Sequence, residues 1–108
     1  MADFINDRER GEERKYEMDQ EMQFRVEARR NKLLGEWLAG EFSMGPAETE
    51  EYVKQVIIAD LEEPGTEDVV RKILADIFER GGNISEEKIR EKIIEFDIVA
   101  ARQLHEEG

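Results

Sequence analysis

Apolar residues recur every three or four positions along most of this chain, which is the spacing that places them on one face of an α-helix. The pattern begins at Met18 and predicts helices over about 18–42, 47–62, 67–80 and 86–106. No stretch alternates between apolar and polar residues as a half-exposed strand does. We therefore predict an all-α fold, a compact antiparallel four-helix bundle with a flexible N-terminal arm.

Each expected helix has one apolar face that is predicted to build the core. The residues on these faces are Met18, Met22, Val26, Leu33, Leu34, Trp37, Leu38 and Phe42 in the first helix, Tyr52, Val53, Val56, Ile57 and Leu61 in the second, Val69, Val70, Ile73, Leu74, Ile77 and Phe78 in the third, and Ile89, Ile93, Ile94, Phe96 and Ala100 in the fourth.

Glycine and proline mark the turns between the helices, and Thr66 and Ser85 are the expected N-caps of the last two helices. Pro46 suits the first turn of the second helix, because a proline there loses no hydrogen bond. Consecutive glycines after the third helix readily adopt the left-handed backbone conformation with which many helices end. The turn-forming residues are Gly40, Gly45, Pro46, Pro64, Gly65, Gly81 and Gly82.

Residues 1–17 differ in composition from the rest of the chain. Residues 6–15 include no apolar side chain, and Gly11 lies in their middle. A segment that buries no apolar surface cannot offset the entropy lost on ordering, so we expect a flexible arm that becomes helical on a target. The chain then divides into an arm at 1–17 and a single four-helix domain at 18–108.

Charge excludes several classes of partner. The 108 residues carry 16 Lys and Arg against 28 Asp and Glu, a formal net charge of −12, so no nucleic acid partner is expected. Positive charge is concentrated near the N-terminus, because residues 1–32 hold 8 of the 16 cations.

The absence of cysteine fits a reducing, cytoplasmic setting. No apolar run reaches the roughly 20 residues needed for direct membrane insertion.

Side chains for catalysis or metal binding are scarce. His105 is the single histidine, and Ser43 and Ser85 are the only serines. No motif has the spacing of a calcium loop, a zinc site or a phosphate-binding loop. We therefore expect a protein that is not an enzyme and needs no cofactor.

A compact basic cluster, Arg29, Arg30 and Lys32, is unusual on so acidic a chain. In one interpretation these cations neutralise acidic groups on adjoining helices, since such ion pairs are common. In the other they form a docking patch for a partner. The pattern alone leaves both interpretations open.

The segment DRERGEERKYEMDQEMQFRVEARRNKLLGEW, residues 7–37, resembles the N-terminal third of the zeta subunit of alphaproteobacterial F-type ATP synthases, a family of small inhibitor proteins. ARRNKLLG, residues 28–35, is the most specific part of this resemblance. A looser similarity continues through DVVRKI, residues 68–73, and the last helix, so that it covers nearly the whole chain.

The resemblance implies a regulatory inhibitor of the F1 ATPase, with the alpha, beta and gamma subunits as partners. The arm would insert at an alpha/beta catalytic interface, order as a helix and block rotary ATP hydrolysis. The protein would then be cytoplasmic and peripheral to the inner membrane through ATP synthase. The arm residues that the resemblance places at the interface are Phe4, Asp7, Arg8, Glu9, Arg10, Arg14, Lys15 and Tyr16.

Four residues depart from the family's arm pattern, and each is expected to weaken the arm: Gly11, Glu12, Glu17 and Met18. The alternative function is therefore a non-inhibitory helical-bundle interaction module that binds a partner through the Arg29, Arg30 and Lys32 patch. With no heptad seam in the sequence, we expect a monomer when the protein is free.

Overall fold

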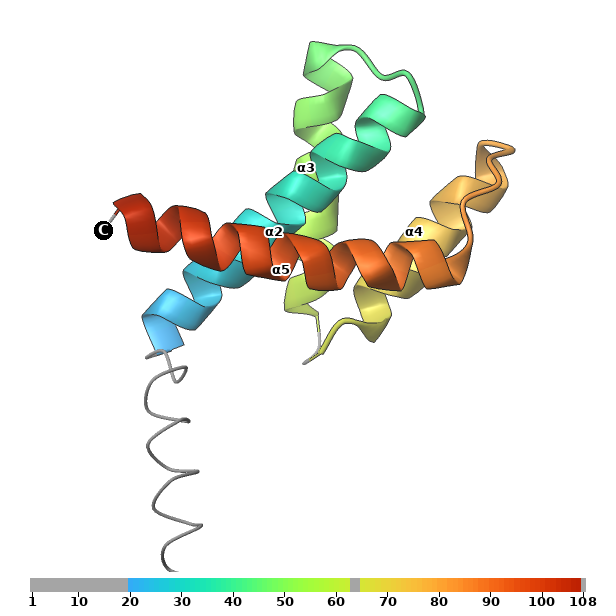
Figure 1. The fold of residues 1–108 in the computed structure, drawn as a ribbon. Coiled ribbons are helices and arrows are strands. Elements are labelled where there is room, and N and C mark those ends of the chain that lie inside the picture. Colours follow the sequence, from blue (N-terminus) through green and yellow to red (C-terminus); the bar gives the residue numbers. More distant parts are fainter. Residues whose placement is uncertain (1–19, 63–64, 108) are drawn as a thin grey trace, which may run out of the picture.

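The computed structural model describes residues 20–62 and 65–107, and this part of the chain forms helices and no strand. The helices are α2 (Gln20–Glu41), α3 (Pro46–Leu61), α4 (Glu67–Glu79) and α5 (Glu86–Glu107) (Figure 1). The predicted all-α, four-helix fold is confirmed. The predicted arm at 1–17 and the predicted helix start at Met18 lie outside the described residues.

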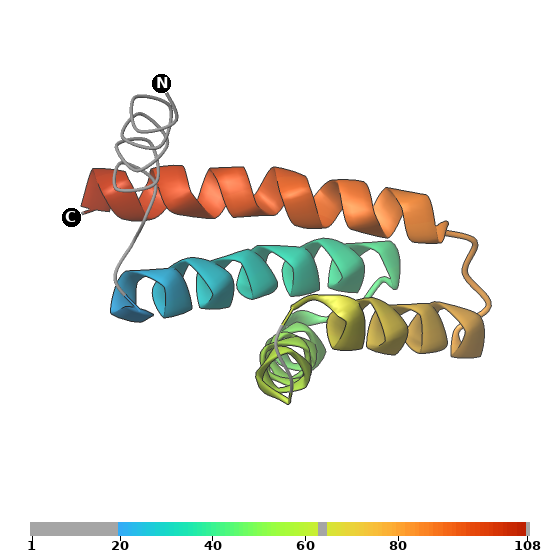
Figure 2. The same cartoon turned by 90° about the horizontal axis from the view of Figure 1, so that it is seen from below.

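The chain turns back after each helix (Figure 1), and α2 makes the most extensive contacts with its neighbours. It packs against α3 and against α5, while α4 contacts α3 and α5. Figure 2 shows α3 nearly end-on, whereas α2, α4 and α5 lie lengthwise in the same view. The helices of this bundle therefore cross one another and do not all run parallel.

Local sequence signals account for two of the helix starts. Pro46 occupies the first turn of α3, after Gly45 as N-cap. At the start of α5 the Ser85 hydroxyl oxygen accepts a hydrogen bond of 3.1 Å from the Lys88 backbone N–H, so the predicted serine cap is confirmed. Thr66 occupies the predicted N-cap position of α4, and its carbonyl oxygen accepts from the Val70 N–H at 3.0 Å, but its side chain makes no cap hydrogen bond.

A residue with the left-handed backbone conformation, which has a positive φ, follows the end of α2 and of α4. Gly81 has a φ of 71°, and the next N–H, that of Gly82, donates to the Ile77 carbonyl oxygen at 2.9 Å, as the glycine pair predicts. The corresponding residue after α2 is Ser43, with a φ of 58°. A serine in this conformation is strained, and no pattern in the sequence pointed to it.

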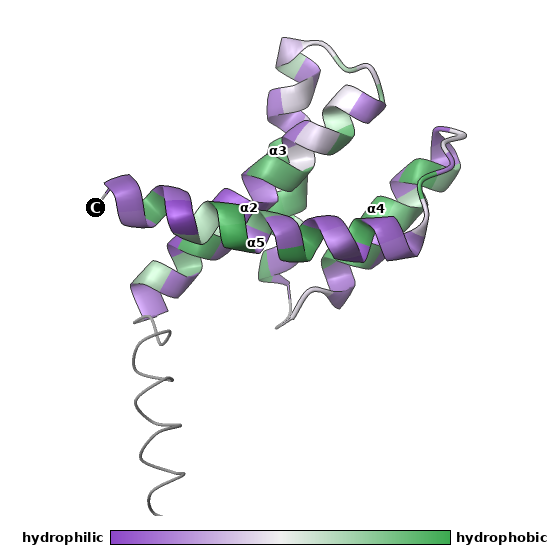
Figure 3. Ribbon diagram, viewed as in Figure 1, coloured by the Kyte–Doolittle hydropathy of each residue, from purple (hydrophilic) through white to green (hydrophobic). Residues whose placement is uncertain are grey.

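Most of the buried side chains form one cluster, the main core, to which all four helices contribute. Figure 3 shows the hydrophobic residues gathered on the parts of the helices that face one another. Trp37 and Phe42, expected in the core, are half-buried and pack against it. The main core consists of Leu34, Leu38, Tyr52, Val56, Val69, Val70, Ile73, Ile77, Ile89 and Ile93.

A second, smaller cluster joins the first half of α2 to the last half of α5. Its buried members are Val26, Ala100 and Leu104, and Met22, Leu33 and Ala101 pack around them. We call it the α2–α5 cluster. The burial of Leu104 was not predicted, because the apolar pattern of the last helix becomes sparse after Ala100.

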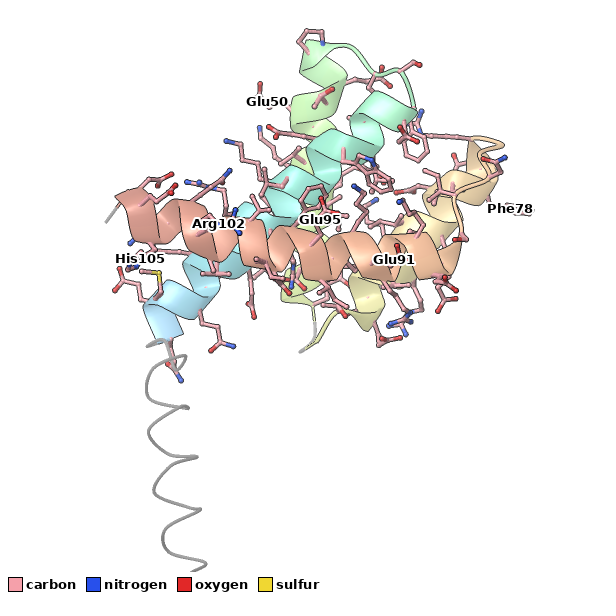
Figure 4. The ribbon with its side chains drawn as sticks, viewed as in Figure 1. Glu50, Phe78, Glu91, Glu95, Arg102 and His105 are labelled. Carbon is pink, nitrogen blue, oxygen red and sulfur yellow. The ribbon has the colours of Figure 1, made fainter. Side chains whose placement is uncertain are left out.

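Three residues expected in the core are exposed. The exposed fraction is 60% for Leu61, 88% for Phe78 and 63% for Ile94. Phe78 points away from the body at the end of α4 (Figure 4). Phe78 and Ile94 each follow a buried residue directly, and one residue turns a helix by about 100°, so their side chains lie beyond the edge of the covered stripe.

α2 and α3 approach each other closely at a glycine, Gly35. A Cβ atom on Gly35 would lie 3.0 Å from Val53 Cγ2 and 3.1 Å from Val53 Cα. The missing side chain therefore sets the distance between the two helices.

Candidate functional site

The candidate site residues fall into two groups. The eight residues assigned to the arm, Phe4, Asp7, Arg8, Glu9, Arg10, Arg14, Lys15 and Tyr16, lie outside the described residues. The three cations of the basic cluster lie in the middle of α2 and take three different environments.

Arg30 is enclosed by three helices. Its side chain is 5% exposed, and its guanidinium contacts a carboxylate oxygen of Asp60 in α3 at 3.1 Å and one of Asp97 in α5 at 3.2 Å. Its Nε donates to Asn31 Oδ1 at 3.1 Å. Arg30 therefore neutralises acidic groups of adjoining helices and presents no cation to a partner in this conformation.

Asn31 and Asp60 complete this buried polar group. Asn31 is 1% exposed, and its Nδ2 donates to Asp60 Oδ2 at 3.0 Å. Throughout residues 20–62 and 65–107, no buried side-chain nitrogen or oxygen lacks a hydrogen-bond partner. The satisfied bonds offset the cost of removing the charges from water.

The spacing of residues along α2, unlike the basic cluster itself, identifies Arg30 as an inward-facing residue. Val26, Arg30, Leu34 and Leu38 follow one another at intervals of four, so that Arg30 continues the buried stripe of α2. A cation in such a position needs acidic partners from the helices that cover it.

Arg29 links α2 to the end of α5 through an ion pair and hydrogen bonds. Its two terminal nitrogens donate to the two Glu107 carboxylate oxygens at 2.9 and 3.0 Å, and one of them also donates to Gln103 Oε1 at 2.9 Å. The hydrogen bonds from Arg29 lower the pKa of the Glu107 carboxyl, and the same pairing raises the pKa of Arg29. Arg29 thus serves as an ion-pair partner inside the chain, with 24% of its side chain exposed.

Lys32 is exposed on α2, and together with Arg29 it lines a groove between α2 and α3. The groove has a volume of about 750 Å³. Arg30 is absent from its lining. We call it the α2–α3 groove, and it is lined by Phe24, Arg25, Ala28, Arg29, Lys32, Glu36, Pro46, Thr49, Glu50, Val53, Lys54, Ile57 and Leu104.

The charge of the α2–α3 groove is opposite to that of the chain. Four of its lining residues are cations and two, Glu36 and Glu50, are acids, and Arg29 is already paired with Glu107, so the lining together with that carboxylate carries 4 − 3 = +1 against −12 for the whole sequence. The groove therefore attracts acidic groups, whereas most of the remaining surface repels them.

The arrangement offers binding surfaces, of which the α2–α3 groove is one. Among the residues that the structure describes, no three His, Cys, Asp or Glu side chains come together as a metal site. None of the four described helices is both long and apolar enough to cross a bilayer. The single histidine, His105, lies exposed near the end of α5 (Figure 4).

Comparison with known proteins identifies relatives of the whole fold. A protein solved by solution NMR is 41% identical in sequence and superimposes with a TM-score of 0.71, over 81% of this chain and 99% of its own. No curated protein matches the sequence. The family described as ATPase inhibitor subunit zeta matches residues 1–103. Since that match spans the arm and nearly all of the helical body, the chain belongs to the family of ATPase inhibitor zeta subunits.

Proposed function

We propose that this protein is a regulatory inhibitor subunit of the F1 ATPase, and that residues 1–17 carry the inhibition. They insert at an alpha/beta catalytic interface, order as a helix and block rotary ATP hydrolysis. The observation that carries the proposal is the family match, which begins at residue 1 and so includes the arm as well as the body. Bound in this way, the protein is held at the inner membrane through ATP synthase.

The composition of the arm supports insertion into an interface. Arg8, Arg10, Arg14 and Lys15 supply cations that pair with carboxylates of the motor, and such pairs strengthen when they are removed from water. Phe4 and Tyr16 supply aromatic anchors of the kind that dominate interfaces. As one helix, 17 residues extend about 25 Å, long enough to pass from a surface into an interface.

The helical body serves as the dock that holds the arm near its target. Tethering raises the effective concentration of the arm, so that a weakly binding segment is still captured. The cations of the basic cluster that remain for docking are Lys32, which is exposed, and Arg29, which is partly used by Glu107.

Steady-state ATP hydrolysis by an alphaproteobacterial F1 stripped of its own inhibitor tests the proposal. The full-length protein should suppress turnover, and the triple variant Arg8→Ala, Arg10→Ala, Arg14→Ala should not. A control variant, Lys88→Ala with Arg102→Ala, removes exposed cations of α5 and should inhibit as well as the unchanged protein. Equal inhibition by the arm variant and the control would overturn the role of the arm.

A non-inhibitory interaction module is the second candidate, and the α2–α3 groove is the observation that favours it. In that case the full-length protein binds its partner through Arg29 and Lys32 but leaves hydrolysis unchanged. Measuring binding and turnover on the same F1 preparation separates the two functions, because only the inhibitor couples the first to the second.

A further inference from the structure

We propose that the α2–α3 groove holds an acidic amphipathic helix of the F1 assembly. The choice of F1 rests on the proposed function above. The chemistry of the occupant follows from the shape, the apolar floor and the charge of the groove itself.

The groove is elongated. Its lining on α2 runs from Phe24 to Glu36, and its lining on α3 runs in the opposite direction from Ile57 to Pro46. At 1.5 Å per residue the α2 side extends for about 18 Å, which is the length of three helical turns. α2 and α3 cross each other (Figure 2), and the hollow beside their crossing admits a third helix that contacts both.

The floor of the groove is apolar, with one aromatic side chain in the open. Phe24 is 53% exposed, and Val53 and Ile57 beside it are half-buried. Past the end of the groove, Phe24, Ile57 and Leu61, which is 60% exposed, border a small second hollow that Glu27, Asn31 and Asp60 also line. An amphipathic helix would cover the apolar floor of the groove with its apolar face.

The cations along the groove are available to a partner. Arg25 and Lys32 are exposed and form no ion pair within 4.0 Å among residues 20–62 and 65–107, although both help to lower the pKa of Glu107, whose carboxylate is bound by Arg29. Lys54 has a side chain that is 62% exposed, and its nearest acid, Glu50, lies 4.0 Å away. Carboxylates on the polar face of the bound helix would pair with these three cations and fix its register.

The position of the groove connects it with the arm. Phe24 lies four residues after Gln20, where α2 begins. A helix bound in the groove therefore lies close to the point at which the chain continues towards residues 1–17. One partner surface would hold both the body and the start of the arm.

Charge reversal in the full-length protein tests the proposal on purified F1. Lys32→Glu lies in the groove, whereas the control Lys88→Glu makes the same charge change at an exposed lysine of α5. We expect the first to weaken binding by about tenfold, mainly through slower association, and to reduce the salt dependence of binding. The control should change the dissociation constant by less than about twofold.

The identity of the occupant is tested by placing a photoreactive benzoylphenylalanine at position 24. Ultraviolet crosslinking to F1 should yield a peptide from an acidic helix. The inference is overturned if both charge reversals have equal effects, or if the crosslinks lead to residues 1–17, to a basic segment or to no protein. Binding that depends on Lys32 without inhibition would sink the proposed function and leave this inference standing, and absence of binding would overturn both.

Discussion

The main core and the α2–α5 cluster both lie along α2, but different interactions hold them together. The main core has ten buried residues from four helices, including Leu34, Ile73 and Ile89 at 0% exposure. The α2–α5 cluster has only three buried apolar residues from two helices. Ionic contacts flank the smaller cluster, with Arg29 bound to Glu107 and Arg30 bound to Asp97.

The difference shows where stability and binding reside in this fold. Apolar area removed from water is the main source of stability, so the main core supplies most of the free energy of folding. The α2–α5 cluster buries less area and needs the arginines to keep the end of α5 on α2. It is also the end at which α2 begins and the α2–α3 groove opens, so the less stable region carries the proposed contacts.

The largest expected effect comes from a cavity in the main core. Ile73→Ala should lower the free energy of unfolding by about 3 to 4 kcal/mol, because Ile73 is fully buried among residues that cannot close around the gap. Leu104→Ala, in the α2–α5 cluster, should cost only about 2 kcal/mol, since fewer neighbours surround it. Urea unfolding followed by circular dichroism measures both, and a larger cost for Leu104→Ala would reverse the comparison.

Removal of the buried guanidinium tests the polar group between the two clusters. Arg30→Leu should lower the free energy of unfolding by about 3 kcal/mol, because Asp60, with a side chain 8% exposed, loses its charge partner. The control Arg102→Leu removes an exposed arginine of α5 and should change stability by less than about 0.5 kcal/mol. Equal effects in thermal unfolding would show that Arg30 is not a structural cation.

The two glycines of α2 differ in their surroundings, because one lies in the contact with α3 and the other contacts no neighbouring helix. Gly35→Ala should cost about 1 to 2 kcal/mol, since the added Cβ meets Val53 and pushes α3 away. Gly40→Ala meets no atom within 4 Å and should stabilise the helix by up to about 1 kcal/mol. A stabilising Gly35→Ala, measured by urea unfolding, would mean that α2 and α3 separate without loss.

Periodicity was sufficient to predict the helices and most of the main core. Ile73 and Ile89 were recognised because a helical repeat places them on the same face as their buried neighbours. Phe78 and Ile94 were misjudged for a related reason. The repeat identifies which side of a helix is apolar, but the width of the covered stripe depends on how the neighbouring helices cross it.

The candidate site was less predictable, because the charge of a side chain does not reveal whether it faces the core or the solvent. Arg30 and Lys32 are both cations on α2, yet two positions turn a helix by about 200°, so one is buried and the other is exposed. The acidic partners of Arg30 are Asp60 and Asp97, 30 and 67 residues away. Nothing local in the sequence links residues so distant, and the α2–α3 groove depends on the same long-range packing.

The smallest expected effect is a local pH dependence at the end of α5. The pKa of Glu107 is lowered by Arg29, so this ion pair is complete at neutral pH and is lost as the pH falls through the lowered value. The protection of the amides around Leu104 against hydrogen exchange, taken relative to their intrinsic exchange rates at each pH, should therefore fall in acid before that of the main core. In Glu107→Gln the same amides should be less protected already at pH 7, and their protection should change little in acid, whereas Glu106→Gln should behave like the unchanged protein. If Glu107→Gln retained the full acid dependence, the ion pair of Arg29 with Glu107 would not be what holds α5 in place, and the α2–α5 cluster would depend on its few apolar contacts alone.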